Sequence, residues 1–396
     1  MPVAIPSGVV PVKVLSTDEI LYGSRTTSYR WEVLTHSAGV DKLVGYLDGV
    51  VEGSASLSGQ LYAAVKRAGN LKVVDLDIAE PGFMRVRDLD LTSVRLRPVL
   101  VIEGLPEEIP QSVFLVGAAP ENWSDTGRIL SLELLDRATV LDQDEIDSTY
   151  TVDSSTGILA AVATVISSAG ESITVDADVT DTLSSAMVWD VGTTKLQIVN
   201  DLLHALNYDS LWVDGVGKFR AAPYLLPSDR SETYGLLNIP RELVDGKKSI
   251  YGKAWTRDRD LFNVPNKVTA VQFASGDVAA LTGTYTNTDP DSPFSYPSRG
   301  NRWKTKTLEG VETPAGTDFE VIAFLEAVAR RSLIASSSVQ ATVQVKCLPI
   351  PVRVGDVLRF ANVPAGIDAR HVVTSIQLDA SPLGLMSLKL QELVSF

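Results

Sequence analysis

The chain has 396 residues, 45% apolar and 21% charged, a composition that excludes a disordered polypeptide and, at this length, predicts about two to four domains. Its 35 Lys and Arg against 49 Asp and Glu give a net charge of -14, which argues against a protein that reads nucleic acid through a basic surface. No segment approaches the roughly 20 apolar residues of a membrane span, and the first residues lack the pattern of a signal peptide. We therefore expect no membrane insertion and folding in the cytoplasm.

Residues 1–148 are dominated by alternating apolar and polar positions broken by Gly, Pro and Asp, which is typical of an antiparallel sheet with one wet face. The Ser-rich stretch 53–59 alternates like an edge strand or a loop, and Asp48–Gly49 favours a turn. Several short strands at this spacing predict an N-terminal barrel or sandwich. The predicted strands are 28–34, 42–47, 94–102, 113–117 and 128–135.

Residues 149–245 carry helical periodicity instead. One amphipathic helix is predicted over 158–166, with capping hydroxyls at 154–156 and Gly170 as its stop. A second helix is predicted over 196–206, preceded by Thr193–Thr194 and ended by Asn207 in a left-handed cap. Two short apolar runs within 211–221, around Asp214–Gly215, predict a β-hairpin.

Residues 246–396 are β-rich again. The segment 267–273 reads as a strand, whereas Thr282–Asn301 is rich in turn formers and is expected to be an exposed loop or a projecting hairpin. A capping box at Thr317–Glu320 opens a helix predicted over 317–334, with Arg330–Arg331 near its C-terminal end. The remaining strands are predicted at 339–348, 352–360, 371–378 and 385–393, with turns at 355–356 and 382–384.

The spacing of the histidines and the single cysteine does not indicate a metal site or a reactive thiol. His36, His204 and His371 are expected in a loop, on the second helix and on a late strand, without the spacing of a zinc site. Cys347 lies in an alternating run with Val343 and Val345, so we expect a buried core residue. The sequence thus predicts no metal-ligating residue.

Catalytic signatures are likewise missing: the sequence has neither a G-x-S-x-G elbow nor a glycine-rich phosphate loop. Acidic residues gather in one stretch, but turns and a domain boundary account for most of them. Three tryptophans offer faces for stacking on sugars, although we favour core or interface roles. No catalytic or cofactor-binding residue is therefore assigned. The candidates considered are Asp125, Glu133, Asp136, Asp142, Asp144 and Glu145 among the carboxylates, and Trp123, Trp255 and Trp303 among the aromatics.

Several segments together resemble minor tail proteins of long-tailed phages that infect actinobacteria. They lie at 46–50, 113–116, 123–127 and 132–144, followed by the helix and hairpin at 194–203 and 214–219. The segment Val352–Val357 is similar to a strand and turn of tail hub proteins in general.

This resemblance implies a hub with two tube-like antiparallel β-barrels per chain and α/β decoration, assembled as a trimer in the virion. The fold class would be mainly β with α+β insertions. Its domains would be a barrel at 1–148, an α/β domain at 149–245 and a second, discontinuous barrel at 246–396 that carries the loop 282–301 and the helix 317–334. The implied partners are further copies of the chain, a distal tail ring, a tape measure, and tip or fibre proteins.

The function expected from these observations is structural, with genome DNA passing through an acidic or neutral lumen and no enzymatic activity. The alternative is a glycan-binding or glycan-cleaving tail protein, which requires a carboxylate pair in a cleft or an aromatic platform. A cell-surface adhesion module is a further class, disfavoured because the sequence shows no signal peptide.

Overall fold

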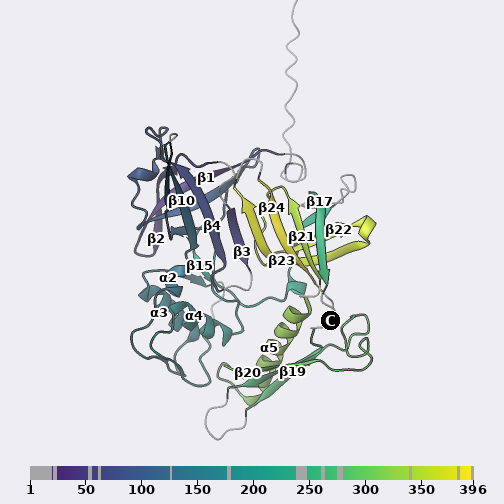
Figure 1. The fold of residues 1–396 in the computed structure, drawn as a ribbon. Helices are drawn as coiled ribbons and strands as arrows, with labels where there is room; N and C mark the ends of the chain where they lie inside the picture. Colours follow the sequence, from purple (N-terminus) through teal and green to yellow (C-terminus); the bar gives the residue numbers. More distant parts are fainter. Residues whose placement is uncertain are drawn as a thin grey trace, which may run out of the picture.

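The computed structural model describes residues 20, 25–51, 56–60, 64–124, 127–175, 180–237, 248–259, 264–273, 280–338, 341–380 and 384–393. It is mainly β, as predicted, with the helices gathered below the largest sheet in Figure 1. Within these residues the buried apolar side chains form separate clusters. One lies in the large sheet, one surrounds α3 (Ile158–Ser168) and α4 (Lys195–His204), and one lies beneath α5 (Asp318–Ser338).

The N-terminal part of the large sheet confirms the strands predicted there. Buried and exposed positions alternate in β4 (Arg67–Val74), where Leu71 and Val73 are fully buried. Gly49 adopts a φ of 74°, which confirms the predicted turn. The other strands of this part are β1 (Thr27–Ser37), β2 (Val40–Leu47), β5 (Phe83–Met84), β6 (Val94–Ile102), β7 (Ile109–Pro110), β8 (Phe114–Val116), β9 (Glu121–Ser124) and β10 (Gly127–Asp136).

The C-terminal part of the sheet draws strands from both sides of α5. Their pairings run β22-β16-β17-β21-β24-β23, and β22 also pairs with β23, so in the described part of the chain this set closes into a ring. The aromatic rings of Tyr251, Trp255 and Phe360 pack against each other, with Phe360 in contact with both. The strands are β16 (Glu232–Leu237), β17 (Lys248–Arg259), β21 (Ala341–Cys347), β22 (Val357–Asn362), β23 (Ile367–Asp379) and β24 (Met386–Glu392).

The two parts are joined by β3 (Ser56–Gln60), which pairs with β4 on one side and β23 on the other. The prediction of an edge strand or loop at 53–59 is therefore wrong for its described residues, while 53–55 lie outside them. Strand β23 changes partner along its length, pairing with β22 over 367–372 and with β3 over 375–379. Its register against β24 shifts between Val373 and Ser375, and such a bulge bends a strand from one sheet into another.

Two closed antiparallel barrels are not the arrangement that these pairings describe. Strand β16 runs parallel to both β17 and β22, so the sheet is mixed. The N-terminal strands form a half-barrel, in which the residues after β2 meet β4 at an isolated bridge between Val50 and Val73. Sequence alternation could not reveal this, because it reports the buried face of a strand and not its partner.

Residues 138–221, here called the helical unit, pack α3 against α4. The Thr194 hydroxyl accepts a hydrogen bond from the Gln197 amide, and Asn207 has a φ of 55°, which confirms both predicted ends of the second helix. The predicted cap of α3 is wrong, because Gly157 occupies the N-cap and no side chain bonds there. The unit also contains α2 (Thr139–Asp142), β11 (Tyr150–Val152), β12 (Ile173–Val175), β13 (Met187–Trp189) and the predicted hairpin β14 (Trp212–Val213) and β15 (Phe219–Ala221).

Residues 264–338, here called the α5 unit, lay α5 across a small sheet of β18 (Lys267–Gln272), β19 (Thr282–Thr286) and β20 (Thr305–Val311). Gly283 permits this contact, since an added Cβ would stand 2.4 Å from the Glu326 amide nitrogen. The capping box is confirmed by hydrogen bonds between Thr317 and Glu320 in both directions. However, α5 continues to Ser338, so Arg331 lies inside the helix rather than near its end.

The loop expected at 282–301 is more ordered than predicted. Its first residues form β19, and the remainder folds on itself: the Asn287 amide donates to Ser292, and Phe294 is only 6% exposed. Turn-forming residues therefore build a compact loop here, not a purely exposed one.

One late strand begins later than predicted, whereas the turn predicted at 355–356 is confirmed. Residues 352–356 form a turn, with Gly355 at a φ of 93°, and β22 begins at Val357. The turn predicted at 382–384 falls largely outside the described residues. Short 3-10 turns occupy Val86–Asp88, Pro227–Asp229 and Val363–Ala365.

Candidate functional site

The carboxylates considered as catalytic are scattered by the fold. Asp136 is buried at the end of β10 and accepts a hydrogen bond from the Ala138 amide, and burial raises the pKa of this carboxyl. Glu133 is exposed on β10, and Asp144 forms an ion pair with Lys195 at 2.7 Å. Asp142 and Glu145 are exposed, and Asp125 lies outside the described residues.

The histidines and the cysteine take structural positions. His36 lies in β1, not in the predicted loop, whereas His204 is on α4 and His371 on β23 as predicted. Cys347 is buried, as predicted, and burial raises the pKa of its thiol to about 12. No group of three His, Cys, Asp or Glu side chains stands ready to hold a metal ion in the part of the chain that the structure describes.

The tryptophans do not form a shared platform. Trp123 is 75% exposed on β9 beside the Arg128 guanidinium, and Trp255 packs on Phe360 inside the C-terminal ring. Trp303 stacks on Tyr296 just before β20. The three rings thus come from different parts of the fold.

A buried network of charges fastens the helical unit to the N-terminal sheet. Arg137, which follows β10, and Arg95 of β6 both bind Glu171, with ion pairs of 2.5 and 2.7 Å. The same two guanidinium groups bind Asp41 of β2, and His36 Nδ1 donates a hydrogen bond to that carboxylate at 2.8 Å. Two cations face two carboxylates here, so the network is neutral apart from the histidine.

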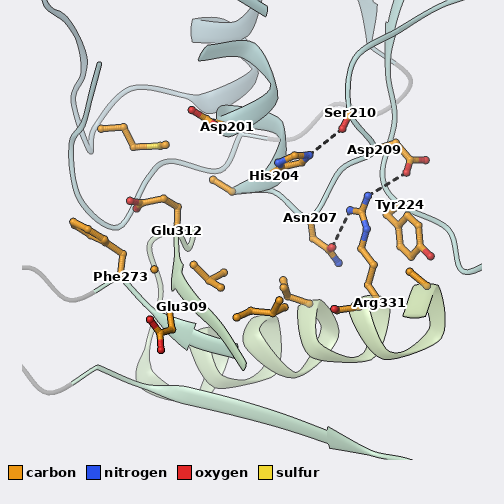
Figure 2. A pocket seen from close by; sticks show the side chains of 18 of the residues that line it. Asp201, His204, Asn207, Asp209, Ser210, Tyr224, Phe273, Glu309, Glu312 and Arg331 are labelled. Carbon is orange, nitrogen blue, oxygen red and sulfur yellow. Dashed lines mark hydrogen bonds and ion pairs between the residues drawn. The ribbon is translucent and has the colours of Figure 1, made fainter. Parts of the chain in front are cut away.

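A cavity with a volume of about 1000 Å³ lies between the helical unit and the α5 unit. Figure 2 shows α5 forming its floor, with side chains of the helical unit pointing in from above. Apolar side chains cover much of its wall, among them Met187, Val188, Phe273, Leu308 and Val328. A cavity of this size with a few polar groups is the usual form of a binding site.

One end of the cavity is basic and closed by internal contacts. The Arg331 guanidinium donates to the Tyr208 carbonyl at 2.8 Å, forms an ion pair with Asp209 at 3.3 Å and stacks 3.9 Å from the Tyr224 ring (Figure 2). Lys66 donates to the Ser210 carbonyl at 3.1 Å, and burial lowers the pKa of this ammonium to about 8. The cationic groups at this end are therefore already paired within the chain, and they connect α5 to the helical unit.

The opposite end is acidic. Glu309, Glu312 and Asp201 line it, and Figure 2 shows both glutamates on the side of the cavity away from Arg331. Asp201 accepts a hydrogen bond from the Trp189 indole at 2.9 Å. Burial raises the pKa of the Glu312 carboxyl, and the nearby Asp201 charge raises it further. The cavity therefore offers an acidic end to a cationic group.

Sequence reasoning did not single out these cavity residues. The Glu309 and Glu312 carboxylates flank a bulge, in which Ala270 pairs with Leu308 but Gln272 pairs with Val311. Gly310 has a φ of 67° there. No strand was predicted at 305–311, although a Glu-Gly pair within a strand is a bulge signal, and the approach of α4 to α5 across the cavity has no local signature.

No helix in the described part of the chain is long and apolar enough to cross a membrane. No protein-family model matches the chain, and neither does any curated protein.

Several solved structures do share the fold. A tail protein from Neisseria meningitidis is 15% identical, with a TM-score of 0.60 over 92% of this chain and 97% of its own. The 43 kDa tail protein of prophage MuSo2 from Shewanella oneidensis is 14% identical, with a TM-score of 0.57 over 91% and 98%. Prophage tail protein gp18 from Listeria monocytogenes is 12% identical, with a TM-score of 0.52 over 91% and 94%. The chain thus has the fold of phage tail proteins along nearly its whole length.

Proposed function

We propose that the chain is a structural hub protein of a phage tail tip, in which three copies form a ring that connects the tail tube to the tip. The single observation that carries this proposal is the fold shared with tail proteins over more than nine tenths of the chain. In this function the C-terminal ring and the N-terminal half-barrel of each copy stand at two of six positions around the axis. The partners are a distal tail ring, a tape measure, and tip or fibre proteins of the same virion.

An exposed apolar stretch on β2 supports assembly. Val40 is 65% exposed, and Leu43 and Val44 are also exposed on this strand, which lies close to the end of the large sheet. Apolar side chains on a strand near a sheet edge mark a surface that another chain covers. Closed cyclic assembly protects such a surface in every copy.

Electron microscopy of the purified protein, together with its mass in solution, tests the proposal. A ring of three chains around an open channel is the expected result. Six chains with one barrel each around the channel would instead indicate a tube or distal ring, and a protein that stays monomeric would contradict the hub.

We also propose that the chain has no enzymatic activity. The rival is glycan cleavage, and one observation favours it: Glu312, with its raised pKa, lines a cavity together with Asp201. Such a pair suits general acid catalysis. Against this, Asp201 already accepts a hydrogen bond from Trp189, which competes with a role as nucleophile or base.

Incubation with purified bacterial cell-wall glycan separates the two functions. The structural proposal expects no release of reducing ends beyond that of a heat-denatured sample. Release that disappears in Glu312→Gln would establish the enzyme instead.

A further inference from the structure

Strand β20 carries opposite charges at its two ends. Just before it, Trp303 is 44% exposed and stacks on Tyr296 with 4.2 Å between ring centres, while the Lys267 ammonium lies 5.8 Å from the indole. Arg302 is exposed beside it. At the other end, Glu309 and Glu312 line the acidic end of the cavity. We call the first surface, made of Lys267, Tyr296, Arg302 and Trp303, the basic aromatic knob.

The knob cannot reach the acidic end within one chain. An extended strand rises about 3.3 Å per residue, so Thr305 and Glu309 stand about 13 Å apart. Trp303 lies two residues before this stretch and Glu312 three residues after it, which adds to the separation. Figure 1 shows the loop that precedes β20 on the side of α5 away from α3 and α4.

The two surfaces match in size and charge. At about 1000 Å³ the cavity has room for an indole ring and one long cationic side chain. Val188 and Phe273 line it and are 60% and 51% exposed, so they offer apolar contacts to an aromatic ring. The carboxylates of Glu309 and Glu312 make no hydrogen bond or ion pair with the described residues, and a guanidinium between them would neutralise their repulsion.

We propose that the basic aromatic knob of one copy of this chain docks in the acidic end of the cavity of a second copy. The contact is heterologous, because the knob and the cavity are different surfaces. A head-to-tail contact of this kind repeats around an axis and closes into a ring when the rotation between copies allows it. The proposal rests on the trimeric function above, for which it names one contact between neighbouring copies.

Disulfide trapping tests this contact directly. The only cysteine, Cys347, is 2% exposed, so it should not form cross-links that compete with those of engineered cysteines. Arg302→Cys and Glu309→Cys chains are purified separately, mixed and oxidised. A covalent dimer is expected in the mixture but in neither chain alone, and a chain carrying both substitutions should give covalent trimers. The matched control replaces Arg302→Cys by Asp77→Cys, whose side chain is 95% exposed on a different surface.

Charge exchange provides a second measurement. Arg302→Glu and Glu312→Arg should each weaken association at least about tenfold, because each sets like charges against each other across the contact. The double variant should regain most of the lost affinity. Recovery of this kind would not arise if either residue served only the fold of its own copy.

The outcomes separate this contact from the hub function. A wild-type trimer without the specific cross-link, or without recovery in the double variant, overturns the contact and leaves the hub standing. A wild-type chain that is monomeric by mass overturns both. If the wild-type chain is trimeric and the Glu312→Arg variant is equally trimeric, the proposed contact is overturned. The acidic end would then hold another occupant, such as a basic peptide of a different tail protein.

Discussion

Glu171 is the side chain on which the joint between the N-terminal sheet and the helical unit depends. It is 1% exposed and faces the guanidinium groups of Arg95 and Arg137, both nearly buried. Removing its charge leaves two buried cations against the single carboxylate of Asp41. Loss of one member of a buried ion pair typically costs about 3 to 5 kcal/mol.

We predict that Glu171→Gln lowers the free energy of unfolding by about 3 to 5 kcal/mol, because the amide keeps the shape but not the charge. Equilibrium urea denaturation measures this. The matched control is Glu108→Gln, which removes the exposed partner of Arg30, for which a change of about 0 to 1 kcal/mol is expected. Equal effects in the two variants would show that the network does not hold the joint.

His371 makes the C-terminal ring sensitive to acid. It is fully buried on β23, where Nδ1 lies 3.0 Å from the Ala369 carbonyl and Nε2 has no hydrogen-bond partner among the described residues. Burial lowers the pKa of this imidazole, and the hydrogen bond to the Ala369 carbonyl and the Glu392 charge oppose this only in part. In the unfolded chain the pKa of this imidazole is about 6.5. Below that pH the unfolded chain therefore binds a proton that the folded chain does not bind.

We predict that the stability due to neutral His371 is fully present above about pH 6.5 and falls by up to about 1.4 kcal/mol per pH unit below it. The measurement is the free energy of unfolding between pH 7.5 and 5. His371→Phe, which keeps a ring against Phe360, should reduce the slope by one proton. His204, whose pKa is also lowered by burial, contributes to the slope of both proteins and cancels in the comparison. An unchanged slope in the variant would contradict the assignment.

Among the elements, β3 couples the two parts of the large sheet. Its backbone pairs with β4 on one side and with β23 on the other, so it holds the half-barrel and the C-terminal ring in one sheet. A proline inside such a strand removes a hydrogen bond from the ladder.

We expect Ser58→Pro to divide one cooperative unfolding transition into two, because Ser58 pairs with Ala68 and Gln377 in the middle of β3. Scanning calorimetry measures this. Ser56→Pro is the control, since the first residue of a strand tolerates proline better. A single transition in Ser58→Pro, lowered no more than in the control, would show that the two parts are coupled elsewhere.

Prediction from sequence worked where local chemistry decides. Thr194 and Thr317 cap the helices they were expected to cap, and Asn207 takes the left-handed conformation. It failed at β3, whose two serines and one glycine favour an edge strand or a loop, because pairing partners from distant parts of the chain determine its place. For the same reason the cavity was missed: Asp201 and Glu312 are 111 positions apart and meet only through the packing of two units.

For the whole molecule, the net negative charge determines how strongly a hub of the proposed kind would bind DNA. A chain with 35 basic and 49 acidic side chains repels a polyphosphate on average, and the proposed ring of three copies would bring these charges together around its channel. Passage of a genome requires weak contact, since phosphate-binding lysines would hold the polymer. The basic aromatic knob is one exposed basic surface, and in the proposed assembly it is covered by the next copy.

We therefore predict that the assembled protein does not retard double-stranded DNA in a gel-shift assay at about 0.15 M salt. The matched comparison is Glu312→Arg, which should release the knob from its cavity and raise DNA binding at low salt, while a further Arg302→Glu substitution should remove that gain. Retention by the wild-type assembly that falls steeply with added salt would contradict free passage. If Arg302→Glu alone then abolished the retention, the knob would be a DNA contact in the assembled ring, and the acidic end of the cavity would need a different occupant.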